Sequence, residues 1–226
     1  MHNTRAQGSY RELKNRIPVL LDRDDISTVL PDLLSHPAPK LLGALYTALL
    51  NPKIRVKWHA VTAAGACVSS LADKDLEQAR VVMRRFMWTL NDESGGIGWG
   101  SPECMGEIMA RNMILAREYH RIFFSYLVQG DTGSDNYLEH LPLRRGAFWG
   151  LARLAQGHPE LSRQACTQVQ KALQKESDPE ILALICLYLG LIQDDFGMSR
   201  PDPGNQSIML YWNQQLQQVP ARDLCR

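Results

Sequence analysis

The sequence has few β-strand signals and no long hydrophobic run. It contains no Asn-Gly or Asp-Gly pair and no alternating run of β-branched residues, the usual marks of hairpins and strands. No segment approaches the roughly 18 apolar residues that a membrane span needs. The N-terminus, MHNTRAQGSYRELKNR, has no apolar core of a signal peptide. We therefore expect an all-α, soluble, cytoplasmic protein with no membrane association.

Neither the charge nor the cysteines mark out a particular class of ligand. The chain has 25 basic and 24 acidic residues, a net charge of +1, whereas nucleic-acid-binding proteins usually carry a basic excess. Nucleic acid is therefore a disfavoured partner. The five cysteines are far apart and form no CxxC pair, which favours free thiols in a reducing compartment over a disulfide framework. A zinc site would need close ligand pairs, so we expect no metal and no cofactor.

Helical periodicity is repeated along the chain. In KLLGALYTALL, for example, Leu41, Leu45 and Leu49 fall on one face. The pattern predicts helices near 9–20, 24–35, 40–50, 75–90, 115–129 and 160–175, and near 205–217. Second helices are expected to open at prolines 52, 102, 142 and 179, at intervals of 50, 40 and 37 residues. Ser101-Pro102 and Asp178-Pro179 are typical of a capped helix start.

Small residues recur behind two of these prolines. Gly106 and Ala110 stand four and eight residues after Pro102, and Gly146 and Gly150 do so after the next proline. Residues four apart lie one helical turn apart on the same face. We therefore expect these two helices to approach a neighbour closely.

Two segments resemble known repeats. LLGALYTALLNPKIRVKWHAVTAAGACVSSL (41–71) is similar to a HEAT repeat, including the phycobilin-lyase-type HEAT-like repeats, and QKESDPEILALICLYLGLI (170–192) resembles the second half of another. The resemblance implies one right-handed α-solenoid over 1–226. It would comprise capping helices in 1–39, about four repeats in 40–193, and a linker with a capping helix in 194–226. An irregular helical bundle is the alternative.

The loop NDESGGIGWGSPE (91–103) interrupts this helical pattern. Glu103 and Glu107 are four residues apart on the helix that follows, so both carboxylates project from one face. With Asp92 and Glu93 they would form an acidic pocket for a cation, walled by Trp99. The glycine spacing fits no phosphate-binding motif, and the acids oppose an anion. The alternative is structural: Ser101 caps the helix, the helix dipole favours Glu103, and Trp99 fills the core.

Tryptophans and arginines elsewhere supply further candidates. Trp58, Trp88 and Trp149 have apolar neighbours, which favours core positions for them. Arg145 and Trp149, four residues apart, also form a candidate recognition pair on the concave face of the solenoid. The residues predicted to bind a ligand or partner are Asn91, Asp92, Glu93, Trp99, Glu103, Glu107, Arg145 and Trp149.

The resemblance to HEAT arrays implies a non-catalytic scaffold that holds a protein partner with a basic segment, or a cationic ligand. An enzyme is the alternative. The chain resembles the HEAT-like alkylpurine DNA glycosylases in size and helical plan, with Trp99, Trp149 and Asp92 as imaginable site residues. A lyase or cofactor-maturation role, like that of the phycobilin-lyase-type proteins, is a third reading. No nucleophile or base with a positioned partner is evident, so we predict no catalytic residues.

Overall fold

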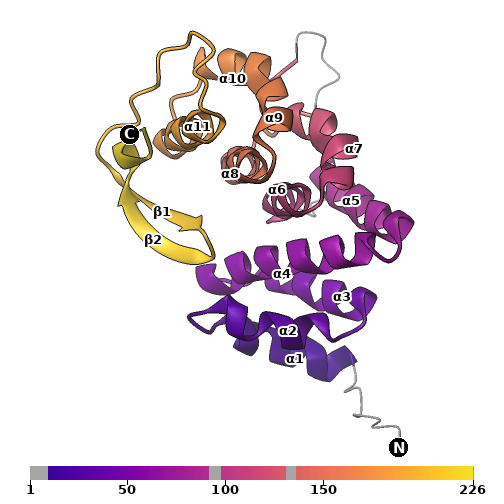
Figure 1. Cartoon of the computed structure of the whole chain (residues 1–226). Coiled ribbons are helices and arrows are strands. Elements are labelled where there is room, and N and C mark those ends of the chain that lie inside the picture. Colours follow the sequence, from indigo (N-terminus) through magenta and orange to yellow (C-terminus); the bar gives the residue numbers. More distant parts are fainter. Residues whose placement is uncertain (1–9, 92–97, 131–135, 226) are drawn as a thin grey trace, which may run out of the picture.

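The computed structural model describes residues 10–91, 98–130 and 136–225, and these are mostly helical (Figure 1). The helices are α1 (Tyr10–Leu21), α2 (Leu30–Leu34), α3 (Ala38–Ala48), α4 (Ile54–Ala72), α5 (Leu76–Leu90), α6 (Ser101–Arg111), α7 (Met113–Phe124), α8 (Leu141–Gly157), α9 (Pro159–Ser162), α10 (Cys166–Leu173) and α11 (Pro179–Ile192). Short 3-10 turns are η1 (Ile26–Thr28), η2 (Arg163–Ala165) and η3 (Ala221–Cys225). No helix within the described ranges has the length and apolar character to cross a membrane.

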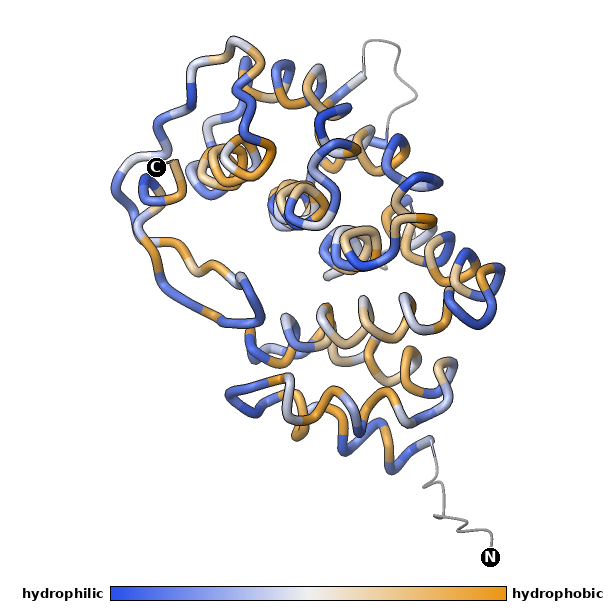
Figure 2. Tube along the Cα trace, in the orientation of Figure 1, coloured by the Kyte–Doolittle hydropathy of each residue, from blue (hydrophilic) through white to orange (hydrophobic). Residues whose placement is uncertain are grey.

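The helices form an inner and an outer row. In the inner row α4 packs on α6, α6 on α8, and α8 on α11, while α3, α5 and α7 pack behind them. Figure 1 shows that the inner row of helices follows a curve and that the C-terminal strands lie opposite the inner side of this curve. Figure 2 shows hydrophobic residues along the inner helices and hydrophilic residues at the outer edges. The helices predicted near 40–50, 75–90 and 115–129 are confirmed as α3, α5 and α7.

One of the two named caps is confirmed and the other is wrong. The Asp178 carboxylate accepts a hydrogen bond from the backbone N–H of Ile181 at 3.1 Å and caps α11. At α6 the cap position belongs to Gly100, whose φ of +77° suits glycine. Ser101 is the first helical residue instead, and its hydroxyl hydrogen bonds to that of Thr89 at 2.9 Å.

Helices α6 and α8 touch through their backbones, which confirms the predicted close approach. A Cβ atom on Gly106 would overlap the Cα atom of Gly150. A Cβ atom on Gly150 would lie 2.9 Å from the carbonyl oxygen of Pro102. Further along, one on Gly157 would overlap the backbone of Ala110. No side chain larger than hydrogen fits at these crossing points, so the glycines fix the distance between the two helices.

The capping helix predicted at 205–217 is wrong. This segment is an antiparallel hairpin of β1 (Ser207–Trp212) and β2 (Gln215–Pro220). Asn213 and Gln214 join the strands in a two-residue turn, and both have positive φ, 49° and 65°. Ile208 and Leu210 alternate towards the helices and are buried. The polar turn lacks the glycine that usually marks a hairpin, which is why the sequence pattern did not indicate it.

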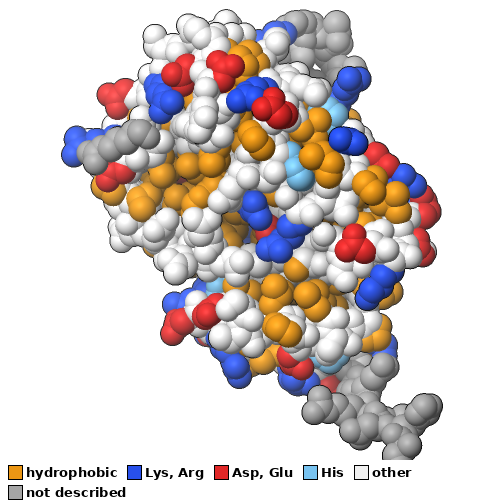
Figure 3. All heavy atoms as spheres, in the orientation of Figure 1, with side chains coloured by type: hydrophobic (Ala, Val, Ile, Leu, Met, Phe, Trp, Pro, Cys, Tyr) orange, Lys and Arg blue, Asp and Glu red, His pale blue; other side chains and the backbone are white. Residues whose placement is uncertain are grey.

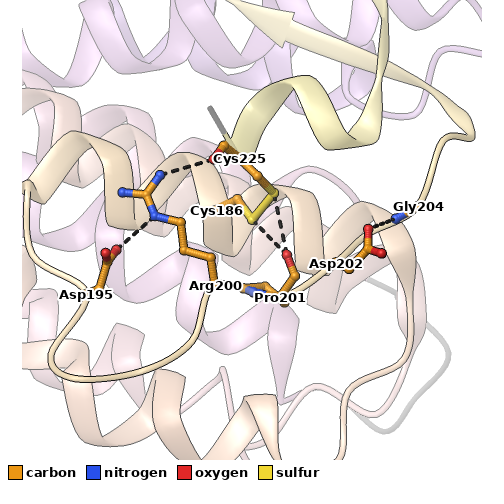
Figure 4. Close-up of a disulfide and its surroundings, with 7 residues drawn as sticks. All are labelled: Cys186, Asp195, Arg200, Pro201, Asp202, Gly204 and Cys225. Carbon is orange, nitrogen blue, oxygen red and sulfur yellow. Dashed lines mark hydrogen bonds and ion pairs between the residues drawn. A yellow bond between two sulfur atoms is a disulfide. The ribbon is translucent and has the colours of Figure 1, made fainter.

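The expectation that all cysteines are free is also wrong. Cys186 of α11 and Cys225 of η3 form a disulfide, with their Cα atoms 4.7 Å apart (Figure 4). The carbonyl oxygen of Pro201 lies near both sulfurs, and Arg200 donates to Asp195 at 3.0 Å and to the Cys225 carbonyl at 3.3 Å. The remaining cysteines, Cys67, Cys104 and Cys166, are free thiols. The 39-residue separation gives no local signal, because only the fold brings η3 to α11.

Removing the disulfide with Cys225→Ser is expected to lower the free energy of unfolding by about 4 kcal/mol, the loop-closure entropy for a loop of this length. Amide exchange in residues 207–220 should accelerate, because the disulfide holds the end of the hairpin on α11. Urea unfolding and hydrogen exchange measure both effects. Cys166→Ser, which alters a free thiol, is the control and should change neither. Equal unfolding free energies in the two variants would contradict the structural role of the disulfide.

The backbone contact between α6 and α8 gives a second prediction. Gly106→Ala should lower the free energy of unfolding by about 1–3 kcal/mol, because the new methyl group forces the two helices apart. Gly190→Ala is a matched control, since a Cβ atom on Gly190 meets nothing within 4 Å. That change should stabilise α11 by up to about 1 kcal/mol through helix propensity. Both variants are measured by chemical unfolding. An unchanged free energy of unfolding in Gly106→Ala would show that the helices are not in backbone contact.

Candidate functional site

The inner helices and the hairpin enclose a cavity of about 270 Å³, which we call the Glu103 cavity. Helices α4, α6, α8 and α11 supply one side of it, and strand β1 supplies the other. Its lining residues are Ile54, Lys57, Trp58, Glu103, Pro142, Arg145, Gly146, Trp149, Glu180, Leu184, Ile208, Met209, Leu210 and Tyr211. Three of the residues predicted from the sequence therefore meet here, drawn from two different helices.

Glu103 is the most unusual residue of this cavity. Its side chain is 3% exposed, and its Oε1 accepts a hydrogen bond from the Lys57 ammonium at 2.7 Å. Its Oε2 is buried and has no hydrogen-bond partner among the described residues. A Cβ atom on Gly146 would lie 2.6 Å from Oε2, so the carboxylate fits only because that position is a glycine. A buried acceptor without a donor is costly, so Glu103 is arranged to receive one.

The charged side chains that line the cavity balance: Lys57 and Arg145 stand against Glu103 and Glu180. Arg145 Nη1 lies 2.9 Å from Glu180, and Arg145 also donates to Asp178, outside the lining, through Nε and Nη2 at 3.0 and 2.6 Å. The carboxylate oxygen of Glu103 that has no partner among the described residues favours an N–H-bearing occupant.

The pKa values of these groups follow from burial and pairing. Burial has the largest effect on the Lys57 pKa and lowers it, but the Glu103 carboxylate outweighs burial and the net pKa is raised. Burial raises the pKa of Asp178, yet the hydrogen bonds from Arg145 and a backbone N–H bring it below its ordinary value. For Glu180, burial outweighs Arg145 and the pKa is raised. Lys57 and Asp178 are therefore held in their charged forms, whereas burial favours the neutral form of Glu180.

Aromatic rings form the wall of the cavity on the hairpin side. Trp58 and Tyr211 stack with ring centroids 5.1 Å apart and planes 12° apart, and Trp149 lies 4.7 Å from Trp58. The Trp149 indole N–H donates to the Tyr211 carbonyl at 2.8 Å, and the Tyr211 hydroxyl hydrogen bonds to Thr62 at 2.7 Å. Tyr211 thus attaches the hairpin to both α4 and α8, and the Lys57 ammonium lies over the Trp58 ring, 5.3 Å from its centroid.

Glu107 lies one turn further along α6 and outside the Glu103 cavity. It is also buried, and each of its oxygens meets one arginine: Oε1 meets Arg111 Nε at 2.5 Å and Oε2 meets Arg153 Nε at 2.6 Å. A Cβ atom on Gly65 of α4 would overlap its side chain. The two glutamates predicted to share a face do so, but their neighbours differ.

Asn91 and residues 98–100 of the loop do not line the cavity. Trp99 packs its ring edge-to-face on His140, with centroids 5.0 Å apart, and does not line the cavity. Asn91 is exposed at the end of α5. A Cβ atom on Gly98 would lie 2.8 Å from the carbonyl oxygen of Thr89, which explains that glycine by packing. The predicted residues Asp92 and Glu93 lie outside the described residues.

The predicted core positions of the three tryptophans are confirmed only in part. Trp58 and Trp149 are buried as expected, but Trp88 is 68% exposed, so its predicted core position is wrong. The apolar neighbours of Trp88 in sequence lie on the other side of α5. Among the cavity residues that the prediction omitted, Tyr211 could have been found only by recognising the hairpin. Lys57 offered no signal beyond a charge within an apolar helix.

Comparison with known proteins does not identify a family for this chain. No protein-family model matches the chain, and no curated protein matches it either. Within the residues that the structure describes, no group of three or more His, Cys, Asp or Glu side chains is arranged to hold a metal ion. The function is therefore argued from the geometry of the cavities.

The Lys57–Glu103 pair gives a prediction about stability. Lys57→Met should lower the free energy of unfolding by about 3 kcal/mol, because it leaves a buried carboxylate without its charge partner. Adding Glu103→Gln to this variant should recover part of the loss, since the unpaired charge is removed. A double-mutant cycle measured by urea unfolding tests the coupling. Additive effects of the two changes would show that the pair does not interact.

Proposed function

We propose that the protein is a non-catalytic binding module that holds a cationic or N–H-bearing group in the Glu103 cavity. The observation that carries the proposal is that Glu103 lines the cavity and that its buried Oε2 has no hydrogen-bond partner among the described residues. The proposal includes a finer description of the fold, in which the paired helices are HEAT-like repeats of a right-handed solenoid. Repeat arrays of this kind place binding sites on their concave face.

Recognition would combine three contacts of different chemistry. An N–H donor of the ligand would satisfy Glu103 Oε2, and a charged donor would do so more strongly than a neutral one. The negative charge of the Glu103 carboxylate favours a cation over an anion at this oxygen. The rings of Trp58 and Tyr211 would cover the apolar body of the ligand, which favours a group with a flat or aliphatic part next to its amine.

The closure of the cavity limits the size of its occupant. The hairpin lies across the inner row of helices, and the space between them is about 270 Å³. That volume suits a small amine or a single basic side chain that a partner protein inserts, and it does not suit a long segment of chain. The protein partner expected from the sequence is therefore proposed as the donor of one Lys or Arg side chain.

The two enzymatic alternatives receive no support from a specific contact. Trp149, imagined as a residue that contacts a damaged nucleotide, is buried and donates its indole N–H to the hairpin. Asp92 lies outside the described residues. The carboxylates of the cavity are paired with Lys57 and Arg145, an arrangement that suits binding more directly than proton transfer.

A fluorescence titration with phenethylamine tests the proposal, because Trp58 and Trp149 lie in or beside the cavity. Wild type should bind phenethylamine, and propylbenzene, a hydrocarbon of similar shape without the amine, should bind about tenfold more weakly or not at all. Nα-acetyl-lysine amide serves as a second probe for an inserted side chain. Glu103→Gln should weaken both amines about tenfold or more, since the ionised acceptor is lost.

Glu118→Gln is the matched control. Glu118 forms an ion pair with Arg80 on the outer surface, with a side chain one-third exposed, and its replacement should leave amine binding unchanged. Circular dichroism checks that the variants keep their helices. Equal affinity of wild type and Glu103→Gln for the amines, or failure of wild type to bind either amine, would overturn the proposal.

A further inference from the structure

A second cavity of about 170 Å³ lies on the other side of Tyr211 and Trp149. We call it the arginine cavity, because Arg111 of α6 and Arg153 of α8 face it together with Glu107. Gln156 and Asn213 close its rim, where the Gln156 amide donates to the Asn213 side chain at 2.8 Å. The cavity thus contains two guanidinium groups against one carboxylate, and its surplus charge is positive.

The two arginines each give Glu107 one hydrogen bond. Arg80 and Arg145 reach a carboxylate through two nitrogens, whereas Arg144 and Arg200 reach theirs through Nε alone. Here each arginine meets Glu107 through Nε alone. The outer edges of both guanidinium groups are therefore not used on Glu107, although their side chains are only 25% and 20% exposed.

Arg153 Nη1 also donates to the Gln156 side chain at 3.2 Å, so the N–H groups that remain for a ligand are those of Arg111 and the Nη2 of Arg153. Guanidinium edges match the spacing of phosphate and carboxylate oxygens and bind them through parallel hydrogen bonds. One carboxylate neutralises only one of two partly buried cations, so a second anion would complete the charge balance. Near the centre of Figure 3, basic side chains lie around an acidic one. Helices α4, α6 and α8 and the hairpin line the arginine cavity.

We propose that the arginine cavity is an anion-binding site that takes the phosphate or carboxylate group of a small molecule. The edges of Arg111 and Arg153 would hold the oxyanion, and the amide side chains at the rim would donate further hydrogen bonds. The volume of about 170 Å³ and the hairpin above it admit such a group. This site does not depend on the Glu103 cavity, because it uses different charged residues and recognises the opposite charge.

Isothermal titration with sodium phosphate, at constant ionic strength set by sodium chloride, tests the site. Wild type should bind phosphate. A parallel titration with sodium acetate shows whether the cavity binds a phosphate or a carboxylate group more tightly. Arg153→Lys keeps the positive charge beside Glu107 but removes the guanidinium edge, so the fold should persist while affinity falls about tenfold or more. Arg84→Gln, a change on the outer surface of α5 where Arg84 pairs with Glu77, should leave binding unchanged.

Glu107→Gln separates this proposal from a purely structural role of the arginines. Removal of the competing carboxylate frees both guanidinium groups, so phosphate should bind as tightly as in wild type or about tenfold more tightly. If the arginines serve only to neutralise Glu107, neither wild type nor Glu107→Gln will bind phosphate or acetate, and the proposal fails. Unchanged affinity in Arg153→Lys would also overturn it. Glu103→Gln should not alter phosphate binding. The anion-binding proposal and the amine-binding proposal can therefore fail independently of each other.

Discussion

The backbone contact between α6 and α8 is the constraint on which the rest of the structure depends. Because Gly106 and Gly150 carry no side chains, the two helices approach until their main chains touch. The acidic side chains of α6 are then enclosed by neighbouring helices instead of reaching water. Glu103 lies against Gly146 and Glu107 against Gly65, so each carboxylate occupies space that a side chain would otherwise fill. Buried carboxylates require partners, and the fold supplies these from other helices.

The hairpin separates two cavities that differ in their charged groups. Tyr211 stacks on Trp58, accepts the indole N–H of Trp149 at its carbonyl and hydrogen bonds to Thr62, and it lines both cavities. On one side Glu103 has a carboxylate oxygen with no hydrogen-bond partner among the described residues. On the other side two arginines, Arg111 and Arg153, face the single carboxylate of Glu107. The disulfide fixes the far end of the C-terminal segment to α11, and so the position of the hairpin depends on contacts at both of its ends.

Much of the helical framework could be predicted from the sequence, and the reason is local. Periodic leucines and the Asp178-Pro179 start are short-range signals, and the glycine spacing behind Pro102 correctly predicted a close approach to a neighbouring helix, although not which helix. The hairpin could not be predicted, because Asn213 and Gln214 adopt positive φ without the glycine that announces such a turn. The disulfide could not be predicted either, since its cysteines are distant in the chain.

The candidate site was predicted in part for the same reason. The i, i+4 spacing placed Glu103 and Glu107 on one face, and this depends only on helix geometry. The choice of partners depends on which helices lie opposite, and Lys57 and Arg153 had no signal in the sequence. Trp99 shows the limit of reasoning from proximity in the chain: it is four residues from Glu103, yet it packs on His140 and does not face the cavity.

A high-resolution crystal structure of the protein, before and after soaking with phenethylamine, tests the central claim most directly. The account predicts that an ordered water molecule lies within hydrogen-bond distance of Glu103 Oε2 in the unsoaked crystal, and that the amine nitrogen replaces it after soaking. A protein N–H or hydroxyl group bonded to that oxygen in the unsoaked crystal would contradict the account, because Glu103 would then already be satisfied and the cavity would have no acceptor to offer.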